Sequence, residues 1–250
     1  FTEAYYNRGL EYTRLGEDDL ALADFSKALQ LDPKYAAAYN NRGVIFGRKG
    51  QHEDAIAEYS RAFEIDPTST ESLFNRGLEF SRLGKYDDAV ADYTRALELY
   101  PGNTDILYNR GIVFGKMGQS EAAIADYLAC IEKNPLSAEA YNNLGVEYSN
   151  LGLIDTSLEN YAKAIEINPR FVEAYNNRGV LYNRPGRYDE AIIEFSRAID
   201  IFNEITGEPA PAQPEASPVV ETQIPGPTGP TPEGNATVEE KPGKVDDYQV

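Results

Sequence analysis

Apolar residues recur along most of the chain at alternating spacings of three and four residues, which is the spacing of one face of an α-helix. In the first segment this face consists of Tyr5, Gly9 and Tyr12, at i, i+4 and i+7. Gly16 follows, and a glycine in that place ends a helix by accepting a left-handed backbone. A second segment with the same spacing runs up to Pro33, where a helix cannot continue. The pattern predicts two consecutive helices joined by a short turn.

This two-helix pattern occurs six times with a period of 34 residues. The predicted repeats span residues 2–35, 36–69, 70–103, 104–137, 138–171 and 172–205. Counted from the first residue of each repeat, position 8 is always glycine: Gly9, Gly43, Gly77, Gly111, Gly145 and Gly179. Position 15 is also always glycine: Gly16, Gly50, Gly84, Gly118, Gly152 and Gly186. The period predicts one domain of stacked repeats over residues 1–205, because each unit buries its apolar face against its neighbours.

Other positions of the repeat keep a fixed residue class. Positions 4, 11 and 24 are aromatic or leucine, positions 20 and 27 are small, and position 32 is proline in the first five repeats. This combination resembles the tetratricopeptide repeat, a helix-turn-helix unit of the same length. The resemblance implies an all-α fold, an α-solenoid wound as a right-handed superhelix of six repeats and twelve helices. It also implies that the first helix of each repeat, helix A, lines a concave face.

Position 7 departs from the family, which usually has an aliphatic residue there. It is arginine in five repeats and Leu144 in repeat 5. Position 23, on the second helix or helix B, is acidic in the same five repeats and Asn160 in repeat 5. The joint loss of cation and acid predicts an ion pair inside each other repeat, such as Arg42 with Glu58, with the arginine stem packed. Independent surface charges are the alternative.

Position 6 of helix A is asparagine in every repeat: Asn7, Asn41, Asn75, Asn109, Asn143 and Asn177. These residues lie on a stripe beside the core stripe. A carboxamide offers a donor and an acceptor, so a row of them matches the peptide groups of an extended chain. The row resembles the asparagine ladder of O-GlcNAc transferase-type repeats, which hold peptide backbones. It predicts a peptide-binding groove; alternatively, the asparagines bond adjacent repeats and only stabilise the stack.

Two more helix A positions flank this asparagine row with opposite charge. Position 2 is mostly acidic, and position 13 is a basic row: Arg14, Arg48, Arg82, Lys116 and Arg184. Helix dipoles alone favour the same arrangement. Position 5 adds three candidate aromatic anchors: Tyr6, Phe74 and Tyr108. We expect the groove to bind a protein or peptide ligand, and an apolar small molecule is the weaker alternative.

Composition restricts the other function classes. The formal net charge of -18 disfavours nucleic acid as a partner. The sequence has no apolar run of about 18 residues, so membrane insertion is not expected. No cysteine pair, histidine cluster or glycine-rich phosphate loop indicates a metal, a cofactor or a catalytic residue, and we expect no enzymatic activity. The one histidine, His52, is expected to be a solvated turn residue.

Residues 206–250 have a different composition, with nine prolines, eight acids and two bases. They predict a disordered or extended tail. No polar cap follows repeat 6, so its apolar face is left to this tail, to another partner or to a second copy of the chain. Homo-oligomeric self-assembly through uncapped terminal repeats is therefore the alternative function. The chain begins at Phe1 and not at methionine, which leaves localisation open with a slight preference for export.

Overall fold

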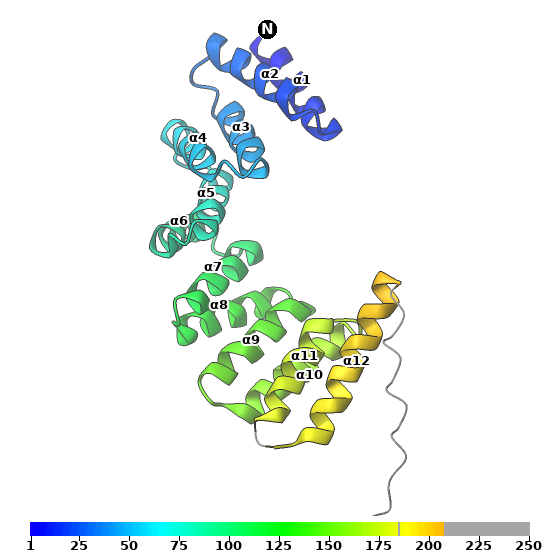
Figure 1. Ribbon diagram of the computed structural model, residues 1–250. Coiled ribbons are helices and arrows are strands. Elements are labelled where there is room, and N and C mark those ends of the chain that lie inside the picture. The colour runs from blue at the N-terminus through cyan, green and yellow to red at the C-terminus, as the bar shows by residue number, and fades with distance from the viewer. Residues whose placement is uncertain (185, 208–250) are drawn as a thin grey trace, which may run out of the picture. The chain divides into compact units, whose positions relative to one another are not determined.

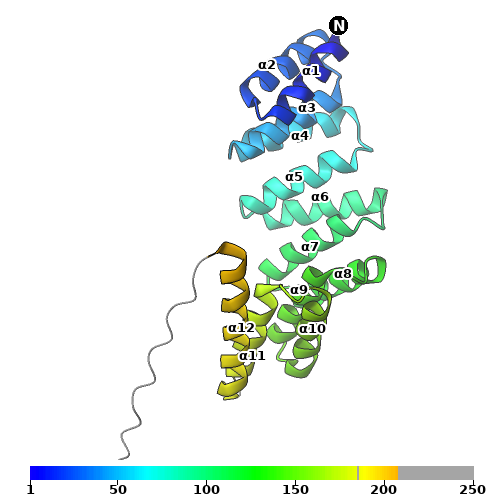
Figure 2. The ribbon, with the colours of Figure 1, turned by 90° about the vertical axis from the view of Figure 1, so that its right-hand side faces the viewer.

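The computed structural model describes residues 1–184 and 186–207, and the regular structure in them is helical throughout. Figures 1 and 2 show the helices as successive antiparallel pairs. Their bounds are α1 Thr2–Leu15, α2 Asp18–Leu31, α3 Ala36–Arg48, α4 His52–Ile65, α5 Thr70–Arg82, α6 Tyr86–Leu99, α7 Thr104–Lys116, α8 Ser120–Lys133, α9 Ala138–Asn150, α10 Ile154–Ile167, α11 Val172–Asn183 and α12 Tyr188–Thr206. The predicted fold of twelve helices in helix-turn-helix repeats is confirmed.

Within each repeat, the glycine at position 8 brings helix A close to helix B. In repeat 4, a Cβ added to Gly111 would lie 2.7 Å from Cε1 of Tyr127, the aromatic residue at position 24. The same approach, at 2.7 or 2.8 Å, occurs in all six repeats. The alanines at positions 20 and 27 are buried around this contact, and Cys130 replaces one of them with 3% exposure. In each repeat, the aromatic ring at position 24 of helix B therefore packs directly against the glycine at position 8 of helix A, and this contact forms the core.

The turns follow from a few residues with special backbone properties. The glycine at position 15 is left-handed in every repeat, with φ between 72° and 80°. After helix B, Asp32 accepts a hydrogen bond from the backbone N–H of Lys34, and Pro33 between them prevents further helix. Repeat 6 has Phe202 and Asn203 at these two places, so α12 continues for one more turn and ends at Gly207, with φ 73°. The loss of the proline at position 32 therefore lengthens the last helix.

The repeats stack in chain order. Each helix packs against its neighbours in sequence, and each odd-numbered helix also contacts the next odd-numbered one, as α1 contacts α3. Within the described ranges, the even-numbered helices make no such contacts with one another. Helix A of every repeat therefore lies on the inner side of the stack, where the predicted groove residues are placed.

The predicted ion pair is present in all five repeats that carry the arginine. Arg42 Nε and Nη2 each lie 2.7 Å from a carboxylate oxygen of Glu58, and Arg76 holds Asp92 in the same forked geometry. The other three pairs are Arg8–Asp24, Arg110–Asp126 and Arg178–Glu194. Each acidic side chain is at most 14% exposed. The arginine also lies over core aromatic rings, as Arg42 does over Tyr39 at 5.5 Å.

The glycine contact predicts a substitution that opposes helix propensity. In the interior of an ordinary helix, replacing glycine by alanine raises the stability by about 1 kcal/mol. Here we expect Gly111→Ala to destabilise the protein by about 1–3 kcal/mol, because its Cβ overpacks against Tyr127. Gly102→Ala is the control, since a Cβ there meets no atom within 4 Å. Urea unfolding of both variants measures the difference, and equal stability of the two would contradict this packing.

The ion pair predicts strong coupling between its two members. Arg76→Leu leaves the carboxylate of Asp92 buried without a partner, which should cost about 3–5 kcal/mol. The double variant Arg76→Leu, Asp92→Asn copies the natural combination of repeat 5 and should recover part of this loss. A double-mutant cycle should give a coupling of about 0.5–3 kcal/mol. Coupling near zero would mean that the two residues are independent surface charges.

Candidate peptide-binding groove

The stripe predicted for the groove converges on a cavity between α3 and α5, on the inner side of the stack. The cavity has a volume of about 510 Å³. Its lining includes Val44 and Arg48 from α3, and Asn75, Leu78 and Arg82 from α5. These are positions 6, 9 and 13 of two consecutive repeats, so the repeat period brings a carboxamide, two aliphatic side chains and two cations around one space.

The asparagine row makes hydrogen bonds between adjacent repeats. At four junctions the carboxamide N–H of position 6 donates to the side chain at position 5 of the preceding repeat. The pairs are Asn41 to Tyr6 at 3.1 Å, Asn75 to Asn40 at 3.4 Å, Asn143 to Tyr108 at 3.1 Å and Asn177 to Asn142 at 3.0 Å. These four asparagines therefore join adjacent repeats of the stack. This is the role weighed as the alternative to peptide binding.

Two members of the row lack such a bond for identifiable reasons. Asn109 follows Phe74, which has no acceptor, and its carboxamide donates to the backbone oxygen of Asp105 in its own helix at 2.8 Å. Asn7 lies in repeat 1, with no preceding repeat in the chain as given. Among the described residues, the side-chain oxygens accept no hydrogen bond in five of the six asparagines: Asn7, Asn41, Asn75, Asn109 and Asn177.

The three aromatic candidates are half-buried and pack into the core. The Tyr6 ring lies 4.8 Å from Tyr35, edge to face, and its hydroxyl accepts from Asn41. Tyr108 packs 6.0 Å from Tyr127. Burial raises the pKa of both Tyr6 and Tyr108, while the hydrogen bond from the asparagine lowers it. Only part of each ring is accessible, so an anchor role for these residues requires a ligand that uses their exposed edges.

The basic row is already engaged by groups of the same chain. Arg14 pairs with Glu11, Arg48 with Asp18 of the preceding repeat, and Arg82 with Glu79. Lys116 lies 5.9 Å over the ring of Tyr86, and Arg184 donates to Ser149 at 3.1 Å. A carboxylate of a ligand must therefore compete with these internal partners. The structure corrects the expectation for His52 as well: its Nδ1 lies 2.6 Å from Glu79.

Sequence reasoning missed a buried carboxylate in the groove wall. Glu79 is 3% exposed and Glu147 is 5% exposed, both at position 10 of helix A. Glu79 contacts His52, and Glu147 accepts from Ser120 at 2.7 Å; His52 and Ser120 are both at position 17 of the preceding repeat. The sequence contains a pattern that indicates this carboxylate, because position 10 alternates between glutamate and an aliphatic residue along the six repeats. The stack therefore has a second period of two repeats.

The described ranges contain no helix long and apolar enough to cross a membrane. In the same ranges, no three histidine, cysteine or acidic side chains are grouped as metal ligands. The predicted docking of the tail involves residues 208–250, which lie outside the described part of the chain.

Models of known protein families match several segments of the repeat region. A model described as TPR repeat matches residues 9–50, and one described as tetratricopeptide repeat matches residues 36–69, 70–103 and 138–171. A second tetratricopeptide repeat model matches residues 92–125 and 160–193. The chain belongs to the tetratricopeptide repeat family. Members of this class use stacked helical repeats as extended binding surfaces for other proteins. A comparison with curated protein sequences finds no match.

Solved structures of this family resemble the chain. A protein named MamA, known from a crystal structure, is 28% identical in sequence, with a TM-score of 0.62. The match covers 66% of this chain and 96% of the MamA chain. YrrB, described as a TPR protein with an unusual peptide-binding site, is 27% identical, with a TM-score of 0.60, and covers 71% of this chain and 91% of its own. A tetratricopeptide repeat protein from Parabacteroides merdae is 22% identical, with a TM-score of 0.69 over 84% of this chain and 80% of its own.

The missing bond at Asn109 gives a prediction on stability. Phe74→Tyr supplies the hydroxyl that Tyr6 and Tyr108 present at the same position, so Asn109 gains a partner in the preceding repeat. We expect a gain of about 0.5–1.5 kcal/mol in the free energy of unfolding. In an Asn109→Ala background the same substitution should give no gain, which is the control. A gain of equal size in both backgrounds would show that the hydroxyl stabilises the protein in another way.

Proposed function

We propose that this tetratricopeptide repeat scaffold binds an extended peptide segment along the inner face, with the asparagine row holding the peptide backbone. Family membership supports an interaction with another protein. The description of YrrB as a peptide-binding relative supports a peptide ligand.

The observation that carries the proposal is the set of unused acceptors. Four of the six asparagines donate their N–H to the preceding repeat, and among the described residues every member of the row keeps its side-chain oxygen free except Asn143, whose oxygen accepts from Asn142 at 3.3 Å. The backbone of an extended peptide presents N–H donors at a regular spacing. The row therefore offers acceptors fixed in place by the same bonds that hold the repeats together. A preorganised acceptor costs less entropy on binding than a mobile one.

The cavity between α3 and α5 gives this interaction a place for a side chain. Val44 and Leu78 supply apolar surface, and Arg48 and Arg82 also line the cavity with half-exposed side chains. Since both arginines are paired with acids of the chain, we expect apolar contact to contribute more to affinity than the attraction of a ligand carboxylate. The ligand class favoured is an extended segment with an aliphatic or aromatic residue, not a strongly acidic one.

The test uses a displayed library of random peptides selected against the full chain. Asn109→Ala should weaken binding of the enriched peptides about 2- to 12-fold, the equivalent of one hydrogen bond of about 0.5–1.5 kcal/mol. The double variant Asn75→Ala, Asn109→Ala should weaken it further. Asn109→Ala should leave the melting temperature unchanged, because Asn109 makes no bond to another repeat.

The control is Asn160→Ala on helix B, whose carboxamide also donates to the backbone oxygen four residues earlier, at 2.7 Å. It should leave peptide affinity unchanged. Peptides that bind wild type, Asn109→Ala and the double variant equally would refute the asparagine row as the binding element. A library that yields no binder would refute the proposed function itself.

A further inference from the structure

The cavity between α3 and α5 contains a tyrosine hydroxyl that the fold does not use. Tyr59, at position 24 of helix B in repeat 2, is 2% exposed and lines the cavity together with Asn75 and Leu78. Its ring packs on Gly43, as the position 24 ring packs on glycine in every repeat. Among the described residues, its hydroxyl has no hydrogen-bond partner. Buried polar groups normally have one, so this hydroxyl requires an explanation.

The packing of the repeat does not require the hydroxyl. Position 24 is phenylalanine in repeats 1 and 6, and the rings of Phe25 and Phe195 pack on the position 8 glycine in the same way. Burial raises the pKa of Tyr59, the charge of Glu79 raises it further, and Arg82 lowers it. The hydroxyl therefore faces two charged residues of the cavity lining, and it stays protonated at neutral pH as a hydrogen-bond donor.

The charged groups of the cavity are already paired within the chain. Arg48 binds Asp18 and Arg82 binds Glu79, and the Glu79 carboxylate also lies 2.6 Å from Nδ1 of His52. A charged ligand group has to separate one of these pairs before it gains a partner. The cavity therefore favours an uncharged polar group over a carboxylate, a phosphate or an ammonium group.

Two uncharged groups in the cavity are free to bind such a ligand. The Tyr59 hydroxyl can donate a hydrogen bond. The side-chain oxygen of Asn75 can accept one, because within the described ranges only its N–H group is bonded, to Asn40 at 3.4 Å. A hydroxyl or a carboxamide of the ligand, which both donates and accepts, is complementary to this pair. Val44 and Leu78 supply the apolar wall that such a pocket needs for the rest of the side chain.

A tyrosine side chain combines these properties better than the other uncharged polar side chains. The cavity, of about 510 Å³, is much larger than a serine hydroxyl requires. Tyrosine buries about 150–250 Å² of mostly apolar surface and keeps a hydroxyl at its end. Guanidinium groups also stack on aromatic rings, as Arg187 lies 4.3 Å over Tyr182 in this chain, so Arg48 and Arg82 suit an aromatic ligand.

We infer that this cavity binds a tyrosine side chain of the peptide ligand, with the phenol hydroxyl paired to Tyr59 and Asn75. The inference rests on the peptide binding proposed above and names the residue that the peptide presents. Asn75 also belongs to the asparagine row. A peptide backbone held by that row therefore passes the mouth of the cavity, where one of its side chains can enter.

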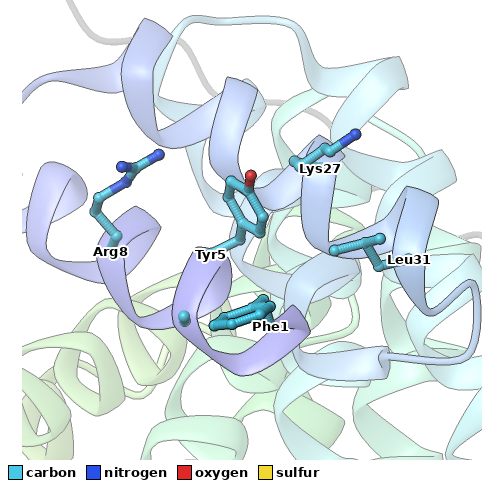
Figure 3. Close-up of a pocket in the computed structure, with 6 residues that line it drawn as sticks. Phe1, Tyr5, Arg8, Lys27 and Leu31 are labelled. Atoms are coloured by element: carbon cyan, nitrogen blue, oxygen red, sulfur yellow. The ribbon is translucent and has the colours of Figure 1, made fainter.

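A second large cavity, of about 490 Å³, lies beside α1 and α2 and offers a comparison. Figure 3 shows Tyr5 and Leu31 in its lining, with the hydroxyl of Tyr5 directed away from Phe1. Tyr5 is half-buried, and within the described chain the asparagine row contributes no residue to this cavity. Tyr5→Phe therefore removes a hydroxyl from a cavity of similar size outside the proposed groove.

The test uses the peptides that the full chain enriches from the displayed library. These peptides should share a tyrosine at one aligned position. Replacing it by phenylalanine should weaken binding to the wild-type chain about 2- to 12-fold, the equivalent of one hydrogen bond. Tyr59→Phe should weaken binding of the tyrosine peptide by a similar factor and binding of the phenylalanine peptide by less. Phosphorylation of the peptide tyrosine should also weaken binding, because the phosphate meets Glu79 and arginines that are already paired.

Two control variants should bind the tyrosine peptides like wild type. Tyr5→Phe is the first, and Tyr93→Phe is the second, because Tyr93 occupies position 24 of the next repeat and is not part of the cavity lining. Tyr59→Phe should keep the melting temperature of wild type, since phenylalanine occurs naturally at this position of the repeat.

The possible failures are distinguishable. Enriched peptides without a common tyrosine, or equal binding of the tyrosine peptide to wild type and Tyr59→Phe, would overturn this inference and leave the proposed function intact. Tighter binding of the phosphorylated peptide would overturn it as well, because it would identify the arginines and not the uncharged groups as the recognition element. A library that yields no binder would refute the proposed function, and this inference with it.

Discussion

In repeats 2 to 4 the guanidinium at position 7 joins three helices and ties each of these repeats to the one before it. In repeat 2, Arg42 binds Glu58 of α4 through Nε and Nη2 and donates to Ser26 of α2 through Nη1, while its stem belongs to α3. One side chain therefore fixes helix A to helix B and repeat 2 to repeat 1. A lysine could not satisfy this geometry, because it lacks the planar fork of donors. Since the carboxylate is buried, losing either charge leaves the other unpaired.

The positions that depart from this arrangement change together. Repeat 5 has Leu144 and Asn160 in place of the pair, and Leu128 replaces the hydroxyl at position 25 of repeat 4. Arg178 of repeat 6 keeps Glu194 but follows Ala162 at that position, and its Nε is buried without a hydrogen-bond partner. The junction between repeats 4 and 5 keeps two other polar pairs, Asn143 with Tyr108 and Ser120 with Glu147. The set of polar pairs thus differs from junction to junction while the apolar packing is retained.

The sequence alone was enough for the helices, the turns and the ion pairs, because each follows from one repeat laid over another. Glycine at position 15, for example, predicts a left-handed backbone at the end of helix A, because glycine adopts positive φ without steric cost. The bonds of the asparagine row were harder to predict, since they join position 6 to position 5 of a different repeat and depend on how far one repeat is rotated against the next. The contact between Glu79 and His52 was missed for the same reason. A histidine at the start of a helix is expected to be exposed to solvent unless the helix that packs against it is known.

The proposed groove and the stack share their polar groups, so peptide binding in this groove would be coupled to the stability of the stack. A ligand that uses the asparagine oxygens leaves the donors in place, whereas one that competes for Arg48 or Arg82 must separate pairs already formed. The forked ion pairs should hold the guanidinium groups of Arg42, Arg76 and Arg110 rigidly. Hydrogen exchange of the arginine Nε–H groups by NMR tests it most directly. Arg42, Arg76 and Arg110 should exchange slowly relative to the exposed Arg61 and Arg95. Exchange of all five at the rate of a free arginine would contradict the account.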